Sequence, residues 1–242
     1  MSETDIYIYY SSWDGRTGSH ALLRQAARQY CRENEPAGKE RVEAALQEAA
    51  GNGPEEAAEK ILVPEAARSS VLRSAGLPCR EEKRRKSEGG DFQFAQAERN
   101  GKPYFADRPD LLFSISHSGK WWVCAFSGVE IGLDLQEIRQ KEEEKLARRF
   151  FHPDEVGWLE QNGFAQFSRL WAYKESYVKY TGVGLREGLD YFSVITKGSL
   201  SGAPDVFQTQ LPFQDGFVLV LTVAKEQAGA ARQARLRELE GL

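Results

Sequence analysis

The stretch LLFSISHSGKWWVCAFSGVEIGLDLQ, residues 111–136, decides the fold of this chain. It divides into three pieces rich in β-branched and aromatic residues: LLFSISHS, WWVCAFSG and VEIGLDLQ. Short breaks separate the pieces, which is the pattern of consecutive strands joined by tight turns. Downstream, FSRLWAYKESYVKYTG (167–182) has apolar residues at helical spacing and predicts an amphipathic helix that ends at Gly182. Strands and helices of this kind indicate an α+β fold.

The segments on either side predict further elements. DIYIYY (5–10) predicts a first strand, and a helix follows over residues 20–33. Pro153 lies at the expected first position of another helix. The pieces YFSVI, VFQTQL and GFVLVLTVA, within residues 191–224, predict an antiparallel meander, and the tail from Lys225 predicts a helix.

These elements fall into two groups that each run from helical to β-rich segments. We therefore expect two α+β halves, residues 1–127 and residues 128–242. The first half has a segment at about 34–90 that is rich in Ala, Glu and Arg and broken by prolines. We interpret this segment as an insertion of short helices.

Composition limits the class of protein. The 242 residues carry 32 Lys and Arg against 36 Asp and Glu, a net charge of −4, which argues against general nucleic-acid binding. The three cysteines, Cys31, Cys79 and Cys124, are far apart and form no CxxC pair, which favours a reducing compartment. The first residues do not resemble a signal peptide, and the apolar stretch at 217–224 is far too short to span a membrane. We expect a cytoplasmic protein with no membrane or nucleic-acid partner.

A carboxylate is predicted to lie on a buried strand in IGLDLQ. Side chains alternate along a strand, so Ile131, Leu133 and Leu135 face one way, while Gly132, Asp134 and Gln136 face the other. A buried acid must be paired, hydrogen-bonded or bound to a metal. From these residues alone, structural hydrogen bonding and metal binding both remain open for Asp134.

Two charged residues share a face of the helix at 167–182. Glu175 and Lys179 are four residues apart, and Lys174 lies about 100° round the helix from Glu175. A solvent-exposed ion pair and a functional site are equally good interpretations, because the aromatic residues nearby argue against a fully solvated face.

Polar residues in FSISHSGKWW are candidates for holding phosphate. Ser116 and His117 lie among small hydroxyl residues before a turn, although a single histidine is more often a structural hydrogen-bonding group. A serine nucleophile activated by His117 is not favoured, because the GxSxG motif is missing. Lys102 precedes Pro103, a common loop pattern that alone indicates little.

Five motifs occur together in a fixed order: GKPYF, FSISHSG, IGLDLQ, FFHPDE and WAYKESYVKYTGVGL, within residues 101–185. In this order they resemble the surfactin-synthetase-activating type of 4′-phosphopantetheinyl transferase. The resemblance implies two halves related by a pseudo-two-fold axis, with coenzyme A in the cleft between them. It also implies transfer of the phosphopantetheine group to a serine of an acyl or peptidyl carrier protein, which releases adenosine 3′,5′-bisphosphate. We expect a monomer, because one such chain can form the whole cleft.

The resemblance also implies roles for individual residues. The implied Mg²⁺ ligands are Asp134, Glu175 and Gln136. The implied coenzyme A contacts are Lys102, Pro103, Ser116, His117, Lys174 and Lys179. The implied catalytic residues are Asp134, Lys179, Glu175 as the candidate base and Glu155 as a contributor. Mg²⁺ uses one or two carboxylates with phosphate oxygens and water, which suits this set.

One position departs from the pattern of the family. The surfactin type has Asp-x-Glu where this chain has Asp134-Leu135-Gln136. We expect Gln136 to be a weak ligand or to hold a metal-bound water. A non-catalytic module that binds coenzyme A or carrier proteins is therefore a second hypothesis, and an unrelated magnesium phosphohydrolase is a third. Carrier proteins are typically acidic, so a basic or apolar patch should receive them, and the aromatic segment at 150–155 is our candidate.

Overall fold

The computed structural model describes residues 5–49, 92–96, 102–139, 143–184 and 188–240. It is a mixed α+β fold with two main sheets, as expected. The first sheet has the order β11-β1-β5-β4 and comprises β11 (Arg235–Glu238), β1 (Tyr7–Ser12), β5 (Trp121–Ser127) and β4 (Leu112–Ser118). The second has the order β6-β10-β9 and comprises β6 (Ile131–Glu137), β10 (Phe217–Ala224) and β9 (Val206–Leu211). The three strands predicted within residues 111–136 are thus confirmed as β4, β5 and β6.

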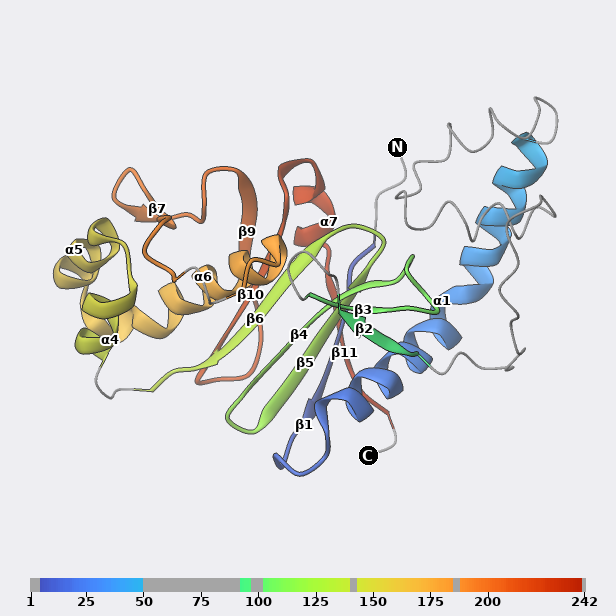
Figure 1. Ribbon diagram of the computed structural model, residues 1–242, viewed down its shortest axis with the longest axis horizontal. Helices are drawn as coiled ribbons and strands as arrows, with labels where there is room; N and C mark the ends of the chain where they lie inside the picture. Colours follow the sequence, from blue (N-terminus) through green and yellow to red (C-terminus); the bar gives the residue numbers. More distant parts are fainter. Residues whose placement is uncertain (1–4, 50–91, 97–101, 140–142, 185–187, 241–242) are drawn as a thin grey trace.

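Helices lie on opposite sides of the strands (Figure 1). One side carries α1 (Ser19–Ala49), and the other carries α4 (Glu143–Phe150), α5 (Pro153–Asn162) and α6 (Phe167–Thr181). The smaller elements are the hairpins β2 (Phe94–Gln96)–β3 (Pro103–Phe105) and β7 (Ile195–Thr196)–β8 (Ser199–Leu200), the 3₁₀ turns η1 (Phe164–Gln166) and η3 (Lys225–Gln227), and α7 (Ala228–Arg232). Among the described residues, no helix is both long enough and apolar enough to cross a membrane.

Both predicted helix boundaries near the site are confirmed. Pro153 is the first residue of α5, and His152 precedes it as the cap, with its Nδ1 accepting a bond from the backbone N–H of Asp154 at 3.2 Å. α6 ends because Gly182 takes a left-handed conformation (φ +74°) that its missing Cβ permits.

Alternation along the strands divides the core into three clusters. One face of the first sheet, including Tyr9, packs on α1. Its opposite face meets the second sheet, where Ile8 and Leu133 belong to one cluster. The outer face of the second sheet, including Val220, is covered by the helices α4 to α6, among them Leu170 of α6. The strands that carry polar site residues are therefore packed on both faces.

The two sheets have the same connectivity. In each, a first strand leads to a helix and then to an antiparallel hairpin, whose last strand pairs with the first strand. These elements are β1, α1, β4 and β5 in one sheet, and β6, α6, β9 and β10 in the other. The expected boundary at residues 127 and 128 falls in the connection between β5 and β6.

A row of serines joins the two sheets where the edge strands β4 and β6 meet. The backbone N–H groups of Leu133, Leu135 and Glu137 donate to the hydroxyls of Ser114, Ser116 and Ser118 at 2.9, 3.1 and 2.9 Å. We call Ser114, Ser116 and Ser118 the serine seam. Side-chain oxygens here accept the backbone bonds that a neighbouring strand's carbonyls would accept in a continuous sheet.

Three expectations need correction. α1 continues to Ala49, beyond the expected end near residue 33, since the Ala- and Glu-rich sequence there favours helix. The rest of the predicted insertion, residues 50–90, lies outside the described residues. In the expected meander, YFSVI contributes only to the short strand β7. The tail is helical only as far as α7, and its last part forms β11, because pairing with β1 overrides local helix propensity.

Candidate active site

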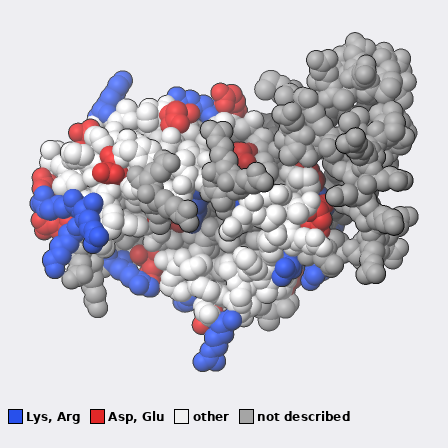
Figure 2. Space-filling view, viewed as in Figure 1, with Lys and Arg blue, Asp and Glu red and all other residues white. Residues whose placement is uncertain are grey.

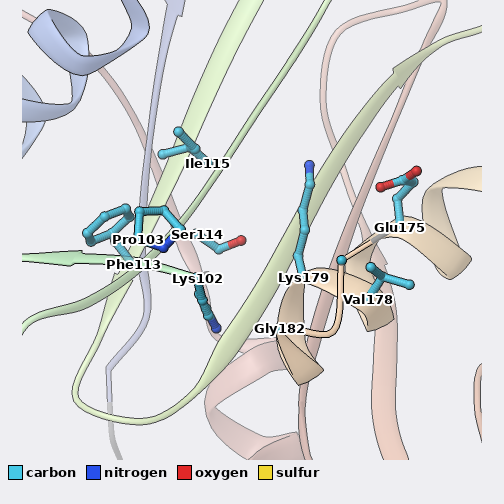
Figure 3. A pocket seen from close by; sticks show the side chains of 10 residues that line it. Lys102, Pro103, Phe113, Ser114, Ile115, Glu175, Val178, Lys179 and Gly182 are labelled. Atoms are coloured by element: carbon cyan, nitrogen blue, oxygen red, sulfur yellow. The ribbon is translucent and has the colours of Figure 1, made fainter. Parts of the chain in front are cut away.

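A cleft of about 320 Å³ opens between the β3–β4 region and α6. The strand side contributes Lys102, Pro103 and Ser114, and α6 contributes Glu175 and Lys179. Figure 3 shows these two groups on opposite sides of the space. The structure thus brings together residues of three expected motifs, GKPYF, FSISHSG and WAYKESYVKYTGVGL.

Gly132 allows α6 to lie directly on β6. A Cβ at this position would be 1.9 Å from the carbonyl oxygen of Ser176 and 2.6 Å from the backbone nitrogen of Tyr180. Only hydrogen fits there, so the helix backbone approaches the strand as closely as packing allows. This close approach sets the distance between Asp134, two residues along β6, and the side chains of α6.

Asp134 is buried, with 2% of its surface exposed, and both of its oxygens accept hydrogen bonds. Its Oδ1 accepts from Ser116 Oγ at 2.8 Å and from Lys179 Nζ at 2.6 Å. Its Oδ2 accepts from Gln136 Nε2 at 2.8 Å. Asp134 points to the side of β6 that the alternation predicted. The cost of burying its charge is offset by hydrogen bonds from Ser116 and Gln136 and by an ion pair with Lys179.

Glu175 is the second carboxylate of the cleft and is 8% exposed. Burial raises its pKa, the negative charge of Asp134 raises it further, and the ammonium of Lys179 opposes both, with a net value of about 7. A solvent-exposed Glu175–Lys179 ion pair is therefore not what the structure shows, because Lys179 donates to Asp134 and Glu175 is buried. Two neighbouring carboxylates repel each other, and a cation bound between them would relieve that repulsion.

The donor set fits a magnesium ion through its two carboxylates. Among the described residues, no group of three or more His, Cys, Asp or Glu side chains could hold a metal. Asp134 and Glu175 are nevertheless within the one or two carboxylates that Mg²⁺ uses when phosphate oxygens complete its shell. Gln136 donates its amide N–H group to Asp134, and its expected role as a weak ligand or as the holder of a metal-bound water stays a prediction. This hydrogen bond stabilises the charged form of Asp134.

Ser116 and His117 lie in different surroundings, and their expected contact with phosphate stays a prediction. Because they alternate on β4, Ser116 faces Asp134 and is 6% exposed, whereas the exposed ring of His117 packs on Trp13 with centroids 4.3 Å apart. Burial lowers the pKa of His117, the charge of Lys179 lowers it further, and Asp134 opposes them. His117 is thus close to the cationic side of the site, while the hydroxyl of Ser116 is already occupied.

Lys174 and Glu155 form an ion pair away from the open cleft. Lys174 Nζ lies 2.8 Å from Glu155 and donates to the Phe192 carbonyl at 2.7 Å, and both charged side chains are fully buried. Glu155 also accepts from the backbone N–H of Val194. Burial lowers the pKa of Lys174 and raises that of Glu155. In this arrangement each side chain compensates the charge of the other, and the expected phosphate contact of Lys174 and catalytic contribution of Glu155 stay predictions.

Lys102 lies at the opposite end of the cleft from α6. Its ammonium contacts Glu130 at 2.5 Å and the carbonyl of Ile131 at 3.2 Å, and its side chain is 18% exposed. These contacts direct the charge of Lys102 toward the beginning of β6, next to the cleft. The implied location of Lys102 and Pro103 along the nucleotide stays a prediction.

Sequence reasoning did not identify the roles of Gly132 and the serine seam. The signal for Gly132 was its position on the same strand face as Asp134, where a missing side chain permits close packing. The signal for the seam was three serines at every second position. That spacing placed the hydroxyls on one face but could not show which partner they would meet.

Part of the chain matches a known family. Residues 130–230 match the model of the 4′-phosphopantetheinyl transferase superfamily. This range contains β6, α5 and α6, and thus Asp134 and Glu175, whereas Lys102, Ser116 and His117 precede it. The resemblance inferred from the motifs is confirmed by this match.

Individual relatives give the same result. A 4′-phosphopantetheinyl transferase of Bacillus subtilis is 43% identical over 101 residues, which cover 40% of this chain and 45% of the relative. The 4′-phosphopantetheinyl transferase Sfp of Bacillus subtilis strain 168 is 42% identical over 110 residues, covering 43% and 47%. HetI of Nostoc, also a 4′-phosphopantetheinyl transferase, is 39% identical over 107 residues, covering 40% and 45%. The chain thus spans a little under half the length of these curated relatives.

Proposed function

We propose that this protein transfers the 4′-phosphopantetheine group of coenzyme A to a serine of an apo acyl or peptidyl carrier protein. The observation that carries the proposal is the group Asp134, Glu175 and Lys179, which lines or adjoins one cleft and lies within the range that matches the transferase superfamily. Adenosine 3′,5′-bisphosphate is the second product.

The cleft supplies charges of the sign that coenzyme A requires. Mg²⁺, held by Asp134 and Glu175 with Gln136 beside them, would neutralise the pyrophosphate when bound. Lys179 acts as a point charge on the phosphates, and His117 and Lys102 with Pro103 lie along the nucleotide. Since Lys174 is bonded to Glu155, we assign this pair to holding α5 against α6.

Glu175 is the candidate for the proton transfer. The serine oxygen of the carrier forms a bond to phosphorus as the bond to the adenosine 3′,5′-bisphosphate oxygen breaks, and the serine proton passes to a carboxylate oxygen of Glu175. Burial and the charge of Asp134 raise the pKa of Glu175, which favours proton transfer to this carboxylate, whereas a bound Mg²⁺ would lower it.

We further propose that the two sheets are halves related by an approximate two-fold axis, that the chain acts as a monomer, and that it works in the cytoplasm. The shared connectivity of the sheets supports the first part. On the face in Figure 2, basic and acidic side chains are interspersed, which favours a protein partner over nucleic acid. We also propose that the aromatic segment at 150–155 receives the carrier protein.

Intact mass of the carrier tests the function. The protein is incubated with Mg²⁺, coenzyme A and a panel of apo carriers, and we expect the mass of one phosphopantetheine group to be added. Asp134→Ala and Glu175→Ala should each lower the rate by at least about 100-fold, because the charge that stabilises the transition state is lost. Unmodified carriers throughout the panel would refute the proposal, and near-wild-type rates in both variants would refute the residue roles.

A second candidate is a module that binds coenzyme A or carriers without chemistry. Gln136 favours it, since an uncharged residue next to Asp134 weakens a cation site. This candidate predicts coenzyme A binding without turnover, and turnover after Gln136→Glu. Turnover by the wild-type protein excludes it, and phosphate release from simple esters without any carrier would instead favour a phosphohydrolase.

A further inference from the structure

The hydroxyl of Ser116 connects the two sides of the site. Its oxygen accepts from the backbone N–H of Leu135 at 3.1 Å and from Lys179 Nζ at 2.9 Å, and its proton is donated to Asp134 Oδ1 at 2.8 Å. A serine hydroxyl has one proton and two lone pairs. Every hydrogen-bonding position of Ser116 is therefore used inside the protein.

Ser116, Asp134 and Lys179 form a closed triangle. Lys179 Nζ is also 2.6 Å from Asp134 Oδ1, so each member is bonded to the other two. Gln136 holds the remaining oxygen of Asp134. The three residues come from β4, β6 and α6, so the triangle fixes a strand of the first sheet against both elements that carry the charges.

We propose that Ser116 is a positioning residue for the transfer reaction, whose hydroxyl holds Asp134 and Lys179 in register with each other. This inference rests on the proposed function. Lys179 has a long side chain that is 28% exposed, so without Ser116 its ammonium has only Asp134 to hold it among these three residues. A lysine that must be ordered at each binding event binds phosphate less well than one already in place.

The serine seam supplies a matched control. Ser118 accepts the equivalent backbone bond, from Glu137 at 2.9 Å, but within the described part of the chain no bond joins its hydroxyl to Asp134 or Lys179. Ser118→Ala therefore removes one bond between β4 and β6, whereas Ser116→Ala removes that kind of bond together with two sides of the triangle. Ser116→Thr retains the hydroxyl.

The experiment compares these three variants with the wild-type protein. Coenzyme A affinity is measured by isothermal titration calorimetry with EDTA and with Mg²⁺, carrier modification by intact mass, and folding by thermal unfolding. We expect Ser116→Ala to weaken coenzyme A binding about 10-fold and to lower kcat/KM by at least the same factor. Ser118→Ala should remain within about 2-fold in both, and Ser116→Thr within about 3-fold, with comparable unfolding midpoints for the two alanine variants.

Several results would overturn the inference. One is a Ser116→Ala protein that binds coenzyme A and modifies carriers as Ser118→Ala does, and another is a Ser116→Thr protein as impaired as Ser116→Ala. If the wild-type protein modifies no carrier but binds coenzyme A, the proposed function fails, while the affinities still decide the role of Ser116. A wild-type protein that binds no coenzyme A overturns both.

Discussion

Glu175 shows how a single residue can be placed where its charge is unfavourable. It lies on α6 beside Asp134, and burial together with that like charge raises its pKa to about 7. A carboxyl group whose pKa is higher in the folded state than in the unfolded state binds its proton more tightly when folded. Its contribution to stability is therefore greatest below the unfolded value of about 4.5 and is lost as pH rises through 7.

Replacing Glu175 by its neutral isostere should remove this penalty. In metal-free protein at pH 8, we expect Glu175→Gln to be more stable than wild type by about 2 kcal/mol, with the difference shrinking as pH falls through 7 and disappearing below the unfolded pKa of about 4.5. Urea unfolding at several pH values in EDTA measures the effect. A difference independent of pH would mean that Glu175 keeps its charge in the folded protein, and addition of Mg²⁺ should reduce the difference if the two carboxylates hold the ion.

Lys174, the neighbour of Glu175 in the sequence, forms a fully buried ion pair with Glu155. Lys174→Ala should cost about 3–5 kcal/mol in the free energy of unfolding, because Glu155 is left buried without its partner. The double variant Lys174→Met with Glu155→Leu should recover much of that loss, as measured by urea unfolding. Should Lys174→Ala fold with wild-type stability yet bind coenzyme A far more weakly, Lys174 contacts phosphate as the family resemblance implies.

At the scale of elements, the packing of α6 on β6 determines the site. Gly132→Ala places a methyl group 1.9 Å from the Ser176 carbonyl, which requires the helix to move. We expect a loss of about 3 kcal/mol or more, measured by urea unfolding, and a weakened coenzyme A affinity. Gly157→Ala is the control, because its Cβ meets nothing within 4 Å in the middle of α5, and it should be neutral or slightly stabilising. Equal stability of the two variants would show that α6 does not depend on the close approach.

The elements of the site were predictable where a local pattern specified them. The alternation in IGLDLQ predicted the direction of Asp134, and helical spacing with Gly182 predicted α6 and its end. Partners across the fold were not predictable in the same way. The sequence could not show that Lys174 pairs with Glu155, since their separation of 19 residues carries no periodic signal.

At the scale of the whole molecule, the last strand of the described chain pairs with the first. β11 runs parallel to β1, and Arg237 forms an ion pair with Glu33 of α1. Helix propensity misled the interpretation of this tail, because a four-residue edge strand depends on a neighbour more than 200 residues away. Long-range pairing of this kind is the part of a fold that local patterns do not specify.

Removal of residues 235–242 should therefore affect the first sheet as a whole. We expect a lower thermal unfolding midpoint and greater aggregation on heating, because β1 becomes an exposed edge. Light scattering during a thermal scan measures both effects. Arg237→Ala keeps the strand but loses the ion pair, so it should fall only slightly below wild type, and truncated protein that behaves identically to it would show that β11 is dispensable.

The serine seam joins the two sheets through side chains, so the junction depends on which residues occupy three positions of β4. A ladder of peptide groups forms whatever side chains it carries, so it tolerates nearly any mutation that preserves the strand. Here the acceptors at Ser114, Ser116 and Ser118 are encoded one codon at a time. Each substitution at one of these three codons would remove one hydrogen bond between the sheets. Selection that preserves the junction therefore also preserves the hydroxyl of Ser116, which is bonded to Asp134 and Lys179.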